Sequence, residues 1–117
     1  MSTESIIDLA TIAELRATGG DAFLGELIDT YCIETPQLID NLQTALAEGD
    51  AVAFRRHAHS IKSSSAAMGA LGFAAQAREL EYIGRDGDLN VVGERYAALV
   101  ATYGLVEQAL RELQHAA

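Results

Sequence analysis

Residues 58–72, AHSIKSSSAAMGALG, carry the clearest pattern in the chain. At about 100° per residue, the apolar and small residues of this region fall on one narrow side of a helix. These residues are Phe54, Ala58, Ile61, Ser65 and Met68. His59 lies about 140° from Phe54, on the opposite side. The pattern therefore predicts a helix over about Ala51–Met68 that buries its apolar side and leaves His59 in solvent.

The upstream sequence predicts two further helices. A short one runs from about Asp8 to Ala17 and ends at Gly19-Gly20. Asp21 then caps a second helix. The inner face of that helix is expected to hold Phe23, Leu24, Leu27, Ile28 and Tyr31. Pro36 either starts a new helix or kinks a long one, and the apolar pattern, which resumes in phase, favours a kink.

The downstream sequence predicts two long helices after a connection at Gly69 to Gly72. The first begins near Phe73 and breaks over Gly84 to Asp88, and the last runs from about Asn90 to Gln114. Its apolar seam has a four-three spacing: Val92, Tyr96, Leu99, Tyr103, Val106, Leu110 and Leu113.

Short connections between long amphipathic helices predict an all-α fold, an antiparallel up-down four-helix bundle with a short additional N-terminal helix. We expect one domain over residues 1–117, with the bundle at about 8–114 and loose termini at 1–7 and 115–117.

The composition narrows the possible partners. The formal net charge of -9 disfavours binding to nucleic acid or to an anionic membrane, because both require a basic surface. The cations nevertheless gather in one region, which points to a local acidic partner: Arg55, Arg56, Lys62, Arg78 and Arg85. The N-terminus lacks the pattern of a signal peptide, so we expect a cytoplasmic protein, and its Met1 start favours a stand-alone one. Cys32 is the only cysteine, which excludes an internal disulfide.

Of the three histidines, His59 is the candidate working residue. His57 lies on the flank of the apolar seam and suits partly buried packing, and His115 lies in the C-terminal tail. Around His59, one turn away, Lys62 can offset negative charge on a group attached to the ring. Small residues at Ser63 and Ala66 leave room for another protein to approach.

Three other kinds of site fit the sequence poorly. His57 and His59 are two residues, about 200°, apart on a helix, and nearby cations would repel a metal ion, so no metal site is expected. Ser63 is one turn from His59, but a continuous helix offers neither an orienting group nor an oxyanion hole. No glycine-rich phosphate loop is present, so ATP binding is not expected.

Nucleophilic histidine chemistry remains. Imidazole is partly uncharged near neutral pH, and an exposed ring can accept a phosphoryl group and release it again. Positioning and charge compensation dominate phosphoryl transfer, so such a carrier needs few other groups of its own.

These residues resemble the histidine-containing phosphotransfer (HPt) family of bacterial and plant phosphorelays. The family pattern H-x-x-K-G, with a further glycine ten residues after the histidine, reads here as His59, Lys62, Ser63 and Gly69. The resemblance covers roughly residues 8–113. It implies a four-helix bundle whose exposed histidine accepts a phosphoryl group from an aspartate of one receiver domain and passes it to another.

The resemblance also implies residue roles. His59 is the phosphoacceptor and Lys62 its charge-stabilising neighbour, while Ser63 replaces the usual glycine at the point where a receiver approaches. Glu81 matches a position that in some members bonds to the histidine ring. The outward helical face predicts the docking surface for the partner, which together with Glu81 comprises Arg55, Arg56, Ser63, Ala66 and Ala67.

Two functions therefore stand. The first is a monomeric phosphocarrier without kinase activity and without a bound cofactor, which serves the receiver domains of a hybrid histidine kinase and of a response regulator. Magnesium is then expected on the receiver. The second is a non-catalytic bundle that binds a receiver-like partner without phosphorylation. The presence of both His59 and Lys62 favours the first.

Overall fold

The computed structural model describes residues 3–115, which form helices and no strands. The elements are α1 (Thr3–Ile6), α2 (Leu9–Glu48), α3 (Ala51–Ala67), α4 (Leu71–Asp86), the 3-10 helix η1 (Leu89–Val91) and α5 (Gly93–His115). The predicted all-α class is confirmed.

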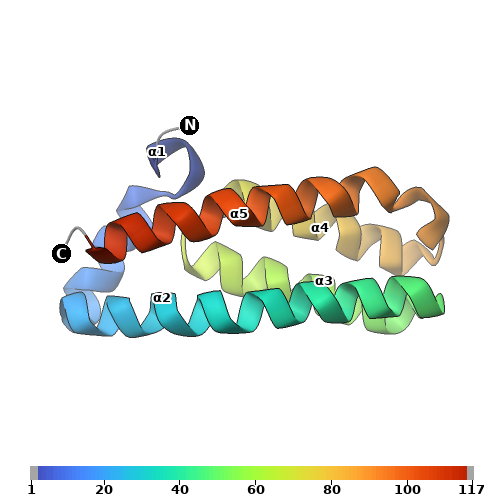
Figure 1. Cartoon of the computed structure of the whole chain (residues 1–117), viewed down its shortest axis with the longest axis horizontal. Helices are drawn as coiled ribbons and strands as arrows, with labels where there is room; N and C mark the ends of the chain where they lie inside the picture. Colours follow the sequence, from blue (N-terminus) through green and yellow to red (C-terminus); the bar gives the residue numbers. More distant parts are fainter. Residues whose placement is uncertain (1–2, 116–117) are drawn as a thin grey trace.

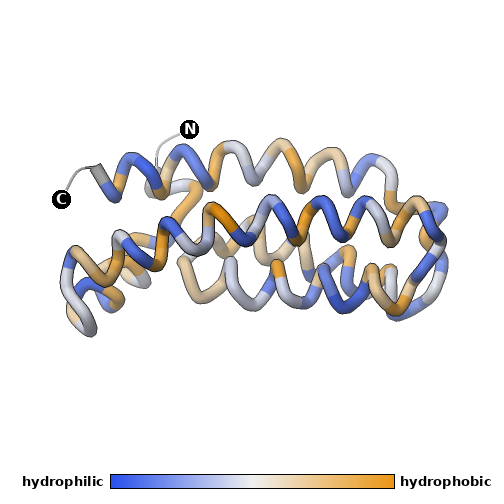
Figure 2. The backbone as a smooth tube through the Cα atoms, turned by 60° about the horizontal axis from the view of Figure 1, so that its bottom comes forward, coloured by the Kyte–Doolittle hydropathy of each residue, from blue (hydrophilic) through white to orange (hydrophobic). Residues whose placement is uncertain are grey.

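The four long helices lie side by side as a bundle about 43 Å long (Figure 1). Helix α3 packs against α2 and α4, and α5 also packs against α2 and α4. Helix α1 contacts α5, near the end of the bundle at which the chain terminates. Hydrophobic and hydrophilic residues alternate along each helix (Figure 2), as helices with one buried side require.

The core contains the seam predicted for α3. Phe54, Ala58 and Ile61 are fully buried, and Ser65 and Met68 are buried with them. The Ser65 hydroxyl lies 2.7 Å from the Tyr31 hydroxyl of α2, which satisfies both polar groups inside the core. The opposite side of α3 is thereby fixed outward, and with it His59.

The expected short helix near residues 8–17 is not a separate element but the first part of α2. The backbone leaves the helical conformation at Gly20, where φ is 85° and ψ is -179°, and α2 resumes at once. A positive φ is accessible to glycine without strain, so the chain bends here without a loop. Asp21 lies directly after this kink, and its carboxylate accepts a hydrogen bond from Arg16 Nε over 3.1 Å. At Pro36 the helix continues, which resolves the choice in favour of one long α2.

Residues 3–7 are structured, although we expected a loose segment over residues 1–7. Thr3–Ile6 forms α1, and the Ile7 side chain is buried in the core. The Asp8 amide donates to the Gly69 carbonyl over 2.8 Å, so the start of α2 is tied to the α3–α4 connection. At the other end, α5 reaches His115, and residues 1–2 and 116–117 lie outside the described part of the chain.

Two further predictions, one for Phe23 and one for Gly84, require correction. Phe23, expected on the inner face, is 36% exposed, and its ring covers Gly19 so closely that a β-carbon there would lie 2.4 Å away. Gly84, expected to break a helix, lies buried within α4, which continues to Asp86 and is capped by Gly87 at a φ of 86°. The break thus begins at Gly87, within the predicted stretch of Gly84 to Asp88 but three residues after its start.

Candidate functional site

His59 and Glu81 are joined across the α3–α4 interface. The His59 ring stands on the solvent side of α3, with 57% of its side chain exposed, and its Nδ1 lies 2.8 Å from Glu81 Oε2 of α4. A carboxylate accepts hydrogen bonds, so Nδ1 of the ring donates. The neutral ring therefore keeps its lone pair on Nε2. This geometry matches the outward direction predicted for His59 and the bond between Glu81 and the ring that the family resemblance implied.

Glu81 also pairs with Lys62. The Lys62 Nζ lies 2.8 Å from Glu81 Oε1, while Glu81 itself is only 12% exposed. Burial alone would raise the pKa of Glu81, but hydrogen bonding to Lys62 and His59, reinforced by the charges of both groups, lowers it overall. The carboxylate is therefore ionised near neutral pH. One buried group thus orients the ring and holds the lysine beside it.

A hollow of about 640 Å³ opens beside Lys62, between α3 and α4. Ser63 and Ala66 from the predicted docking surface line it, together with Arg78 of α4. Arg78 was among the cations that pointed to an acidic partner, but it was not among the predicted docking residues. Its position one turn before Glu81 was the available signal, because residues three apart share a helix face.

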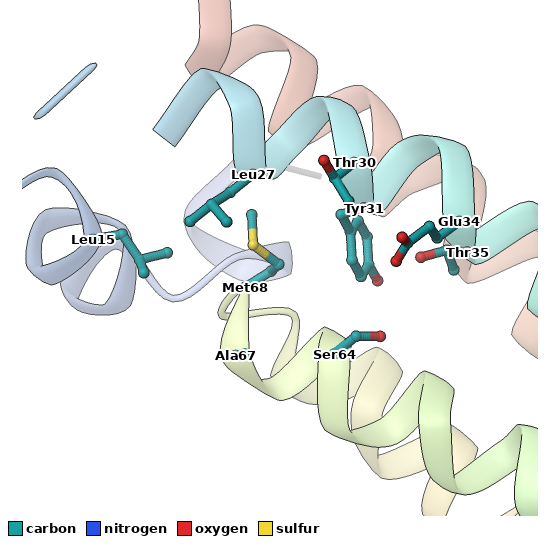
Figure 3. Close-up of a pocket in the computed structure, with 9 residues that line it drawn as sticks. All are labelled: Leu15, Leu27, Thr30, Tyr31, Glu34, Thr35, Ser64, Ala67 and Met68. Carbon is teal, nitrogen blue, oxygen red and sulfur yellow. The ribbon is translucent and has the colours of Figure 1, made fainter. Parts of the chain in front are cut away.

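Ala67, in contrast, lines a smaller and more apolar hollow on the α2 side of α3, of about 220 Å³. Figure 3 shows Leu15, Leu27 and Met68 around this hollow, with Tyr31 beside them. The structure therefore divides the predicted docking residues, with Ser63 and Ala66 on one flank of α3 and Ala67 on the other.

The cations near the site differ from those elsewhere. Arg16, Arg95 and Arg111 each form an ion pair with an acidic residue, as does Arg85 with Asp86. Arg55, Arg56 and Arg78 form none with the residues that the structure describes, and all three are exposed. The unpaired cations thus lie on the two helices that carry the site.

The serine run gives no support to hydrolytic chemistry. The Ser64 hydroxyl donates to the Ser60 carbonyl of its own helix over 3.0 Å, and Ser65 is engaged with Tyr31 in the core. No group of three or more histidine, cysteine, aspartate or glutamate side chains suited to a metal ion occurs within residues 3–115. His57 is partly buried, as its position on the flank of the apolar seam predicted.

Comparison with known families decides the class of this protein. The model of the Hpt domain matches residues 26–116, which include the whole of α3 and α4. The chain belongs to the Hpt domain family. A solved structure similar to it is that of histidine-containing phosphotransfer protein B (HptB) from Pseudomonas aeruginosa PAO1. The two share 28% sequence identity, with a TM-score of 0.90 over 96% of each chain.

The comparison with curated proteins found no match. Within the described part of this Hpt domain, no helix combines the length and apolar character needed to cross a membrane. Membership of the family and the close structural likeness give the general function predicted from the sequence, which is histidine phosphotransfer between receiver domains in a two-component phosphorelay.

Proposed function

We propose that His59 is the residue that carries the phosphoryl group, through its Nε2 atom. The observation that supports this most directly is the Nδ1 contact with Glu81, because it leaves the Nε2 lone pair of an exposed ring available for attack. In the step, the Nε2–P bond forms while the bond between phosphorus and the aspartyl oxygen of the donor receiver breaks. The aspartate leaves as a carboxylate, and a second receiver aspartate reverses the sequence.

Glu81 and Lys62 have complementary roles in this step. The ring gains positive charge as the Nε2–P bond forms, and Glu81, which accepts from Nδ1–H, stabilises that charge. Lys62 keeps the carboxylate ionised despite its burial and brings a cation beside the incoming phosphoryl oxygens. With a neutral ring, these three side chains carry no net charge, so the doubly negative phosphoryl group is not repelled.

The receiver is proposed to dock over the outer side of α3. Its acidic phosphorylation pocket would face the unpaired Arg55, Arg56 and Arg78, and the floor at Ser63 and Ala66 is small enough for close approach. The two partners are a hybrid histidine kinase and a response regulator, and the receiver supplies magnesium. The chain acts as a monomer in the cytoplasm without kinase activity. Its helices alternate in direction, as the short connections between them favour.

A labelling experiment tests the phosphoacceptor. A phosphorylated receiver domain with magnesium is expected to transfer acid-labile, alkali-stable phosphate to the wild-type chain and to His57→Gln, but none to His59→Gln. ATP and magnesium without a kinase should leave every variant unlabelled. Label retained by His59→Gln would contradict the assignment. Receiver binding without any labelling would instead indicate a non-catalytic interaction module.

A further inference from the structure

Gly84 lies at a close approach between α3 and α4, the two helices that carry the site. A β-carbon added to Gly84 would lie 3.0 Å from the Cα, the Cβ and the backbone nitrogen of Arg55, whereas ordinary contacts of such atoms are 3.4–4 Å. Gly84 is buried and helical, so no turn or positive φ requires a glycine there. The separation of two packed helices depends on the side chains at their contact. Glycine at this position therefore permits a separation that a larger residue would not.

This contact is next to the phosphotransfer site on both helices. Arg55 precedes His59 by one turn on α3, and Gly84 follows Glu81 by one turn on α4. The pairs Arg55–Gly84 and His59–Glu81 are thus successive contacts along one antiparallel interface. Because a helix is rigid over a single turn, a change in separation at the first pair is passed to the second.

We infer that Gly84 is a positioning residue of this site: its missing side chain sets the α3–α4 separation at which Glu81 can hold His59 Nδ1. The inference rests on the proposed roles of His59 and Glu81. An added methyl group requires the helices to part by several tenths of an ångström. The hydrogen bond of 2.8 Å between Nδ1 and Oε2 then lengthens, and the ring is released to the Nε2–H form. In that form Nε2 carries the proton and has no lone pair available to attack phosphorus.

Gly84→Ala tests this inference with Gly104→Ala as the matched control. Gly104 is also a glycine within a helix, α5, but a β-carbon there meets no atom within 4 Å. Nitrogen-15 NMR of the unphosphorylated chain reports which ring nitrogen of His59 carries the proton, and a phosphorylated receiver gives the transfer rate. We expect Gly84→Ala to move His59 towards the Nε2–H form and to slow transfer about tenfold. Gly104→Ala should change neither.

The double variant Gly84→Ala with Gly104→Ala separates a displaced His59–Glu81 contact from a general loss of folding stability. Alanine at position 104 raises helix propensity without steric cost, so it should restore stability and leave the α3–α4 contact unchanged. At a melting temperature near that of the wild type, the double variant should still transfer slowly. Wild-type ring shifts in Gly84→Ala would overturn the inference, whether or not its transfer rate falls. If the wild-type chain takes no phosphate at all, the proposed function fails, and the ring measurement still decides the role of Gly84.

Discussion

At the scale of single residues, Glu81 connects His59, the proposed nucleophile, to the ammonium group of Lys62. It is the least exposed of the three site side chains, and it contacts the other two with different oxygens. An amide in its place would still accept from His59 Nδ1 but would lose the charge that pairs with Lys62. Glu81 is therefore expected to support both the geometry and the stability of the α3–α4 contact.

The lowered pKa of Glu81 makes this contribution dependent on pH. A carboxyl group whose folded pKa lies below its ordinary value of 4.5 stabilises the fold above that value, and the stabilisation is lost as the pH falls through the folded pKa. Wild type should therefore melt above Glu81→Gln at neutral pH, and the difference should shrink in acid. Calorimetry between pH 7 and pH 3 measures both curves. A constant difference across that range would show that Glu81 ionisation does not contribute.

At the scale of elements, Gly69 explains why a glycine follows the site helix. It has a φ of 81°, and a β-carbon there would lie 3.0 Å from the Asp8 carbonyl oxygen and 3.2 Å from Thr11 Cβ. The connection between α3 and α4 therefore requires glycine for its conformation and again for its contact with α2. These two requirements can be separated by comparison with Gly87.

Gly87 has a similar φ of 86° but no atom within 4 Å of an added β-carbon. Gly87→Ala should cost about 1 kcal/mol of unfolding free energy, from backbone strain alone. Gly69→Ala should cost about 2–4 kcal/mol, because steric conflict with α2 is added to the strain. Urea denaturation of both variants gives the comparison. Equal losses would mean that the contact with Asp8 adds nothing.

The sequence predicted best what depends on helix periodicity. The buried seam from Phe54 to Met68 fixed the outward direction of His59, and the structure agrees. Glycines were harder to interpret, because the residue that ends a helix and the residue that lets two helices touch look alike in sequence. Gly84 was therefore assigned to the start of a break, and Gly20 to a helix end, whereas α2 resumes directly after the kink at Gly20. The contact with Arg55 on the neighbouring helix identifies the role of Gly84, just as the partner of Lys62 becomes clear only once α4 is placed beside α3.

At the scale of the whole molecule, charge is unevenly distributed. The chain carries a net charge of -9, yet Arg55 and Arg56 on α3 and Arg78 on α4 form no ion pair with the described residues. An acidic body repels acidic receivers in most orientations, whereas this face attracts them. The arrangement favours productive encounters and fits a carrier that must release each partner after transfer.

Glu81 is proposed to hold Nδ1 of His59, so that the phosphoryl group is carried on Nε2. The most direct test is phosphorus-31 and nitrogen-15 NMR of the chain after phosphorylation by a receiver domain, with histidine labelled in the ring. We expect one phosphohistidine, with phosphorus coupled to Nε2 of residue 59 and a proton retained on Nδ1. Phosphorus bonded to Nδ1, or to the ring of His57, would contradict it.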